Sequence, residues 1–330
     1  SFIMFQNKTV LITGGTGSFG KKLVTTFIQK KIKVKKLIIF SRDELKQFEM
    51  QKIYSPEKYK FLRYFIGDIR DKERLKFAFR DVNIVVHAAA LKQVPTAEYN
   101  PIEYIKTNII GAQNILEASL ESNSISKVLA LSTDKAVSPA NLYGATKLCS
   151  DKLFLSANAI KGKQNIKFSV LRYGNVMMSR GSVIPNFLNT KDNHFNITDK
   201  RMTRFSLTLD DSVRAAFFGL KKMNGGEIII PKAKSYRILD LAKAINDRKK
   251  LIYTGKRPGE KIDEVLIPNI EASSTYENKD YYVVMNHNKK IKIKGFKKVK
   301  SNFSYISDEN NFLSVAELKN IIESQLKKND

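Results

Sequence analysis

A strand-like apolar run leads straight into a glycine-rich loop within the first twenty residues of the chain. Residues 9–13 read Thr-Val-Leu-Ile-Thr, Gly14, Gly17 and Gly20 follow at three-residue spacing, and a helical pattern begins at Ser18. Such glycines permit a tight turn and let a pyrophosphate approach the backbone, where the helix N-terminus meets its charge. The position of the loop between a strand and a helix predicts a dinucleotide-binding site rather than an incidental turn.

Apolar runs keep alternating with helical patterns through the first half of the chain. This alternation indicates βαβ units, so we expect an α/β fold with a doubly wound parallel (Rossmann) sheet. Further strands are expected at residues 36–40, 59–66, 83–87, 128–132 and 168–172.

The rhythm loosens after residue 176, where prolines interrupt it. We expect residues 1–175 to form the Rossmann domain, with later segments returning to the sheet. Residues 176–330 are expected to form mainly a smaller substrate-binding lobe, ending in an amphipathic helix near residues 315–327.

The basic composition raises the question of a nucleic-acid partner, because the formal net charge is +26. The basic residues are spread along the whole chain, however, and the dense run from Lys289 to Lys300 alternates with apolar residues. That pattern fits an amphipathic strand with a solvated face. We therefore expect no nucleic-acid partner, whereas an anionic substrate such as a nucleotide sugar would benefit from the positive field.

The composition of the chain also bears on membrane contact, cellular location and metal binding. No apolar run approaches the length of a membrane span, so no membrane contact is expected. The single cysteine, Cys149, forbids an internal disulfide and fits a cytoplasmic location. The three histidines, His87, His194 and His287, lack metal-ligand spacing, so no metal site is expected.

The residues after the second expected strand bear on the choice of cofactor. A domain that uses NAD usually offers an acidic residue there to the ribose hydroxyls. This chain places Arg42 where a 2′-phosphate would lie, although Asp43 follows directly. We favour NADP. Asp68, after the third strand, is expected on the adenine side, and a helix-capping aspartate would look the same.

Tyr143 and Lys147 stand four residues apart, on one face of an expected helix. Lys147 can hydrogen-bond the nicotinamide ribose and lower the tyrosine pKa by its charge. Tyr143 can then take a proton from an alcohol that is being oxidised. The pair predicts hydride-transfer chemistry on an alcohol.

A second acid and a second base lie at the end of the fifth expected strand, where Thr133, Asp134 and Lys135 follow one another. The carboxyl ends of parallel strands are where ligands bind in such sheets. Oxidation of an alcohol alone needs only Tyr143 and Lys147, whereas elimination of water needs a further acid and base. The alternative is a capped turn at the strand end.

Taken together, these stretches resemble the extended short-chain dehydrogenases/reductases, and specifically the inverting UDP-N-acetylglucosamine 4,6-dehydratases. The resemblance covers roughly residues 5 to 285, and the Thr-Asp-Lys triplet stands where retaining nucleotide-sugar dehydratases carry Asp-Glu. Further matching stretches are residues 13–20, 41–49, 67–71, 87–92, 98–101, 131–136, 141–147, 172–176, 179–182, 201–205 and 257–261. Departures are Met178, the Ser206-Leu207 pair and Asp263, which put the substrate fit in question.

The resemblance implies a set of site residues and a homo-oligomer, a hexamer. The implied catalytic residues are Thr133, Asp134, Lys135, Tyr143 and Lys147. The implied NADP-binding residues are Gly14, Thr16, Gly17, Ser18, Phe19, Gly20, Ser41, Arg42, Asp43, Lys46, Asp68, Ile69, Ala88, Ala89, Lys92, Asn108, Tyr143, Lys147, Asn175 and Val176. The implied UDP-N-acetylglucosamine-binding residues are Lys92, Thr133, Asn175, Ser182, Arg204, Arg257 and Glu260.

Two other functions remain open at this point. A nucleotide-sugar 4-epimerase on the same fold would need Tyr143 and Lys147 but would have no work for Lys135. A non-catalytic NADP-binding protein would need none of these side chains.

Overall fold

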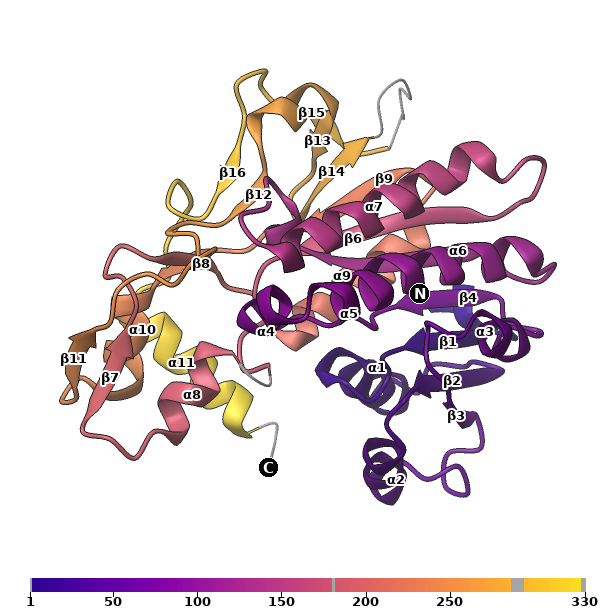
Figure 1. Ribbon diagram of the computed structural model, residues 1–330, viewed down its shortest axis with the longest axis horizontal. Helices are drawn as coiled ribbons and strands as arrows, with labels where there is room; N and C mark the ends of the chain where they lie inside the picture. The colour runs from indigo at the N-terminus through magenta and orange to yellow at the C-terminus, as the bar shows by residue number, and fades with distance from the viewer. Residues whose placement is uncertain (1, 180–181, 286–293, 328–330) are drawn as a thin grey trace.

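A ten-stranded sheet forms the centre of the protein in a computed structural model that describes residues 2–179, 182–285 and 294–327 (Figure 1). Its strand order is β15-β13-β14-β9-β6-β5-β4-β1-β2-β3. The bounds of these strands are β1 (Thr9–Thr13), β2 (Lys36–Ser41), β3 (Leu62–Ile66), β4 (Ile84–His87), β5 (Lys127–Thr133), β6 (Lys167–Tyr173), β9 (Glu227–Pro231), β13 (Thr275–Glu277), β14 (Tyr281–Met285) and β15 (Lys297–Lys298).

The seven strands from β3 to β9 are parallel, and β14, β13 and β15 continue the sheet in antiparallel fashion. All five residues of β1 are buried, as expected for a parallel strand covered on both faces. The chain passes from β1 to β2 on one side of β1 and later returns to pair β4 with its other side. Ligands bind at such a switch point, so the order locates the site at the carboxyl ends of β1 and β4.

Helices cover both faces of the sheet, and two apolar cores fill the space between (Figure 1). Helices α1 and α9 pack together on one face, and α3, α6 and α7 pack against one another on the other. The helices that follow the parallel strands are α1 (Ser18–Gln29), α2 (Glu44–Ile53), α3 (Lys72–Ala78), α4 (Val94–Tyr99), α5 (Pro101–Tyr104), α6 (Gly111–Glu121), α7 (Leu142–Ile160) and α9 (Leu209–Lys222). The expected α/β class with a doubly wound parallel sheet is confirmed.

A smaller lobe with its own apolar core lies beside the sheet, at the left of Figure 1. It contains α8 (Val183–Asn189), α10 (Ile238–Asn246), α11 (Val315–Lys327) and the paired strands β7 (His194–Ile197) and β11 (Lys250–Tyr253). Two short pairs connect it to the sheet, β8 (Thr203–Phe205) with β10 (Ser235–Arg237) and β12 (Val265–Ile267) with β16 (Tyr305–Ile306). Because β9 and β13 to β15 belong to the sheet, the second half of the chain contributes to both the sheet and the smaller lobe.

The lysine-rich run expected as one amphipathic strand lies partly outside the described residues, which omit 286–293. Its described end contains the exposed strand β15. Nowhere in the described ranges does a helix combine the length and the apolar character that a membrane crossing requires.

Candidate active site

A cavity of about 900 Å³ opens at the carboxyl ends of the parallel strands. Its wall contains most of the residues expected to bind the dinucleotide. They are Gly14, Thr16, Gly17, Ser18, Phe19, Ser41, Arg42, Asp43, Lys46, Asp68, Ile69, Ala88, Ala89, Lys92, Tyr143, Lys147, Asn175 and Val176. Thr133 and Ser182, expected on the substrate side, also line it.

The glycine loop and the end of β4 come into close contact at the floor of this cavity. Gly14 has φ +64, and a Cβ atom added there would lie 2.8 Å from the Ala89 Cα. The Thr13 hydroxyl oxygen accepts hydrogen bonds from the backbone N–H groups of Ala88 and Ala89, at 3.1 and 3.2 Å. The backbone at the switch point is therefore fixed and uncovered by side chains, which suits a dinucleotide pyrophosphate.

Two of the expected cofactor residues lie behind the wall instead. A Cβ on Gly20 would come within 2.2 Å of the Gly15 carbonyl oxygen, so this glycine allows α1 to start close to the loop. Asn108 is buried, accepts a hydrogen bond from the Leu91 N–H at 2.9 Å and donates to the Leu91 carbonyl at 2.8 Å. It positions the wall segment that precedes Lys92.

Arg42 and Asp43 differ in what they already contact. The Asp43 carboxylate accepts a hydrogen bond from the Lys46 N–H at 3.0 Å and caps α2. That hydrogen bond lowers the Asp43 pKa. Arg42 is exposed and makes no hydrogen bond or ion pair with another residue in the described part of the chain. Its guanidinium is therefore free to meet an anion in the cavity.

Tyr143 and Lys147 both lie in the first two turns of α7 and are buried. Asn141 caps the helix by accepting a hydrogen bond from the Gly144 N–H at 2.8 Å. Lys147 donates to the Leu131 carbonyl at 2.9 Å, and burial lowers its pKa. Burial raises the pKa of Tyr143 to about 12, despite the opposing charge of Lys135. The expectation of a lowered tyrosine pKa is thus wrong for the protein without ligands.

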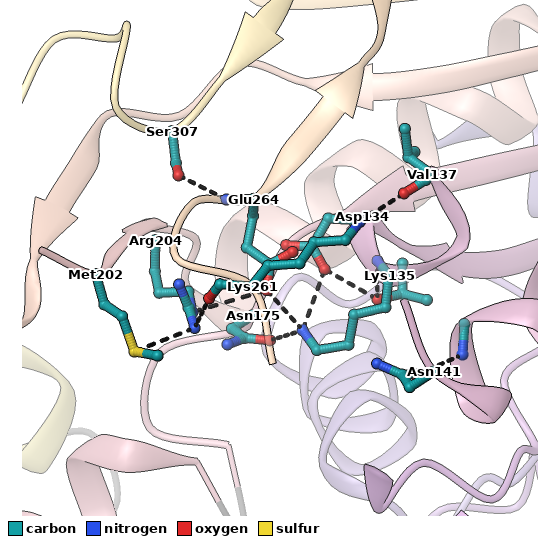
Figure 2. Close-up of polar contacts among 12 residues, drawn as sticks. Asp134, Lys135, Val137, Asn141, Asn175, Met202, Arg204, Lys261, Glu264 and Ser307 are labelled. Atoms are coloured by element: carbon teal, nitrogen blue, oxygen red, sulfur yellow. Dashed lines mark hydrogen bonds and ion pairs between the residues drawn. The ribbon is translucent and has the colours of Figure 1, made fainter. Parts of the chain in front are cut away.

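The acid and base expected at the end of β5 are in direct contact. The turn η3 (Asp134–Ala136) follows Thr133, whose hydroxyl oxygen accepts from the Lys135 N–H, so the strand end is also a capped turn. Asp134 is fully buried, and its Oδ1 lies 3.2 Å from the Lys135 Nζ. Lys135 donates to the Asn175 Oδ1 at 3.0 Å (Figure 2). Neither Asp134 nor Lys135 lines the cavity, but Thr133 and Asn175 do.

The electrostatic environment of Lys135 differs from the expected one. Burial alone would lower the lysine pKa, but the Asp134 carboxylate, joined by Glu264 when that group is ionised, outweighs it and raises that pKa above its ordinary value. The expectation of a lowered Lys135 pKa is therefore wrong for the ligand-free protein. The second carboxylate, Glu264, is a site residue that the sequence reasoning missed.

The segment before β12 encloses this pair from the substrate side (Figure 2). Arg204, expected to bind phosphate, donates to the backbone carbonyls of Thr203 and Ile262 at 2.7 Å each. Lys261 donates to the Val137 carbonyl at 2.7 Å, and burial lowers its pKa. The loop is also tied to α7, because the Asn141 amide donates to the Gly259 carbonyl at 3.0 Å.

Of the remaining expected substrate residues, Arg257 and Glu260 lie outside the cavity wall and Ser182 lies in it. The Arg257 side chain is exposed, and the backbone N–H of Arg257 donates to the Glu260 carboxylate at 3.2 Å. Ser182 lines the cavity, and its buried hydroxyl has no hydrogen-bond partner among the described residues. Arg180 and Gly181, which complete that stretch, are outside the described residues. No group of three or more His, Cys, Asp or Glu side chains in residues 2–179, 182–285 and 294–327 is placed to hold a metal ion.

Comparison with known proteins adds four findings. Residues 10–286 match the family described as polysaccharide biosynthesis protein. A Campylobacter jejuni protein named UDP-N-acetylglucosamine 4,6-dehydratase (inverting) is 50% identical, and the match covers 97% of this chain and 98% of that one. A Rickettsia canadensis protein named UDP-glucose 4-epimerase is 39% identical, over 97% and 96% of the two chains. The X-ray structure of Pen from Bacillus thuringiensis superimposes with a TM-score of 0.91 at 36% identity, covering 98% of this chain and 99% of that one.

Proposed function

The chain belongs to the polysaccharide biosynthesis protein family, together with the inverting dehydratase of Campylobacter jejuni, and from this premise we propose that it is an NADP-dependent UDP-N-acetylglucosamine 4,6-dehydratase that inverts carbon 5. One observation carries the proposal. Asp134 and Lys135 are held 3.2 Å apart, close enough to Tyr143 of α7 for their charges to act on it. Oxidation of an alcohol requires neither this additional acid nor this additional base, whereas elimination of water requires both.

The cavity fits a dinucleotide in shape and in charge. The pyrophosphate would lie over the glycine loop, where Gly14 and Ala89 leave the backbone open. The free guanidinium of Arg42 supports a 2′-phosphate, whereas Asp43 is occupied in capping α2, so NADP is favoured over NAD. When bound, the nicotinamide would supply the group that can accept a hydride from carbon 4 and later return it to carbon 6.

Tyr143 takes the proton from the hydroxyl on carbon 4 while that carbon is oxidised. Burial favours the phenol form of Tyr143, and the positive charge of Lys135 favours its phenolate form. Thr133 lines the cavity next to this tyrosine and would orient the same hydroxyl.

The ketone on carbon 4 then acidifies the hydrogen on carbon 5. Lys135, as a free amine, removes that proton, and Asp134, as a carboxylic acid, protonates the departing hydroxyl on carbon 6. Carbon 5 regains a proton on the opposite face. Two protons leave the sugar, from the carbon-4 oxygen and from carbon 5, and two are delivered, to the leaving hydroxyl and to carbon 5. The proton count therefore balances over one turnover.

The nucleotide end of the substrate would lie toward the 257–260 loop. Arg257 offers a planar set of donors that suits phosphate, and Glu260 lies in the same loop. Asn175 and Ser182 line the cavity and are proposed to meet the sugar. Arg204 can join them only by giving up its contacts to backbone carbonyls. A cytoplasmic homo-oligomer, a hexamer, that feeds surface-glycan synthesis completes the proposal.

Product analysis tests this function. Incubation with UDP-N-acetylglucosamine and NADP should give a product lighter than the substrate by one water, with no net NADPH. A product of unchanged mass would support the second candidate, a 4-epimerase, which the relative named UDP-glucose 4-epimerase brings into consideration. Absence of any product with either UDP-N-acetylglucosamine or UDP-glucose would contradict both.

A further inference from the structure

Glu264 brings a second buried carboxyl group to the Asp134–Lys135 pair (Figure 2). Its side chain is 3% exposed, and its Oε1 lies 3.5 Å from the Lys135 Nζ and 3.8 Å from the Arg204 Nε. The carboxyls of Asp134 and Glu264 thus face the same ammonium nitrogen. Its backbone is fixed, because the Glu264 N–H donates to the Ser307 hydroxyl at 2.9 Å.

The Glu264 carboxyl lacks the hydrogen bonds that stabilise a buried negative charge. Its Oε2 is buried and has no hydrogen-bond partner among the described residues. The nearby cations do not supply one, because Arg204 donates to backbone carbonyls and Lys261 donates to the Val137 carbonyl. A buried carboxylate without donors is unstable relative to its neutral form.

A second buried glutamate shows what a stabilised carboxylate looks like in this fold. Glu227, at the start of β9, accepts hydrogen bonds from the Ser169 hydroxyl at 2.6 Å and from the N–H groups of Asn224 and Gly225 at 2.7 and 2.9 Å. Glu264 is equally buried but has none of these donors. The surroundings of Glu227 therefore suit an ionised carboxylate, whereas those of Glu264 suit a neutral carboxyl group.

We propose that Glu264 is a positioning residue that works in its neutral form and sets the protonation of the Asp134–Lys135 pair. The proposal rests on the function proposed above and deepens it. A neutral Glu264 leaves the Lys135 ammonium facing one carboxylate instead of two. The proton can then pass from the Lys135 Nζ to the Asp134 Oδ1, so that one N–H bond breaks, one O–H bond forms and the net charge stays the same. This single transfer yields both the amine and the carboxylic acid that the elimination requires.

The charges around Glu264 agree with this assignment. Burial and the Asp134 carboxylate raise the Glu264 pKa, against the opposing charges of Lys135, Arg204 and Lys261. The remaining ionisable side chains nearby are the buried Tyr236 and the adjacent Asp263, which accepts a hydrogen bond from the Thr203 hydroxyl at 2.6 Å. As pH rises through the raised Glu264 pKa, the new negative charge stabilises the Lys135 ammonium, and the base is lost.

The first test compares the pH dependence of solvent deuterium entry at carbon 5 in three proteins. Glu264→Gln keeps a neutral group in place at every pH. On the alkaline side, where the wild-type exchange rate falls because Glu264 ionises, the ratio of the variant rate to the wild-type rate should therefore rise about tenfold per pH unit. Asp263→Asn is the matched control. It removes a neighbouring negative charge but keeps an acceptor for Thr203, and its profile should follow wild type. A ratio that stays constant with pH, or loss of exchange in Glu264→Gln at every pH, overturns the proposal.

The second test does not depend on activity. An infrared difference spectrum of the ligand-free protein, wild type minus Glu264→Gln, should contain the carbonyl stretch of a protonated carboxyl group at neutral pH. Bands of an ionised carboxylate alone would overturn the assignment of Glu264. If the protonated band is present but no dehydrated product forms, the proposed function fails while the neutral Glu264 stands.

Discussion

The two halves of the site are built differently. On the cofactor side, the loop after β1 and the ends of β2 and β4 surround an open cavity, and the Arg42 side chain makes no hydrogen bond or ion pair with the described residues. On the substrate side, the charged groups already contact one another or the backbone, as Arg204, Lys261 and Lys135 do. The cofactor half can accept its ligand as it stands. The substrate half must exchange existing contacts for contacts with a nucleotide sugar.

This difference predicts that a change among the mutually contacting charged groups of the substrate half alters chemistry, whereas a change in the cofactor half or at the exposed rim alters affinity. The largest effect is expected at Lys135. Replacing the proposed base should lower the rate of dehydration about 10²–10⁴-fold, the usual contribution of a general acid or base. Lys135→Met should keep NADP affinity, because Lys135 does not line the cavity. Rates and NADP titrations of the purified variant measure both quantities.

Lys261→Met is the matched control for this variant. It removes a lysine of the same charge cluster, but one whose ammonium contacts the Val137 carbonyl rather than Asp134. Its rate should fall far less than that of Lys135→Met. Equal losses in the two variants would mean that the charge of the cluster matters and not the base.

Arg42 is expected to give the next largest effect, and on affinity only. Arg42→Ala should weaken NADP binding by about 1.5–3 kcal/mol, the scale of a hydrogen bond to a charged group. NAD, which lacks the 2′-phosphate, should bind wild type and variant alike, and calorimetric titration with each cofactor measures the difference. Equal affinity of the wild-type protein for NADP and NAD would refute the role of Arg42.

Arg257 tests the rim of the substrate half, where the side chain is exposed. If it binds the phosphate equally in the ground state and the transition state, Arg257→Ala should raise KM roughly tenfold, which corresponds to about 1.4 kcal/mol. The value of kcat should change little. A large fall in kcat at constant KM, seen in initial-rate kinetics, would assign this arginine to the chemical step instead.

The smallest expected effect comes from Asn141, which joins the two halves. Its Oδ1 caps α7, and its Nδ2 donates to the Gly259 carbonyl. Asn141→Asp keeps the cap acceptor but replaces the donor to Gly259 with a carboxylate oxygen that repels that carbonyl. The thermal midpoint should hold while KM for the nucleotide sugar rises by a few-fold, about 1 kcal/mol or less. A clear drop in the thermal midpoint would show that the contact to Gly259 stabilises the fold.

Residues that line one cavity could be grouped from the sequence because the signals of the proposed cofactor half are local. A strand, three glycines and a helix start lie within twelve residues, and the ends of β2, β4 and β5 are each followed by the side chains that line the cavity. Tyr143 and Lys147 are one helical turn apart, so their common face follows from helix geometry.

The substrate half could not be predicted in the same way, because its contacts join distant parts of the chain. Glu264 meets Lys135 across 129 positions of sequence, and nothing in the residues around Glu264 distinguishes it from a solvated glutamate. The pKa directions of Lys135 and Tyr143 were wrong for a related reason. They depend on how deeply each group is buried and on which charges surround it, and neither quantity can be read from residue spacing.

The configuration and isotope content at carbon 5 test the central claim most directly. We would incubate the protein with UDP-N-acetylglucosamine and NADP in heavy water and follow the reaction by proton NMR. The account predicts a 4-keto-6-deoxy sugar in which carbon 5 carries solvent deuterium and has the inverted configuration, with exchange sharply suppressed in Lys135→Met. A product with retained configuration at carbon 5, or exchange that is undiminished without Lys135, would contradict the account.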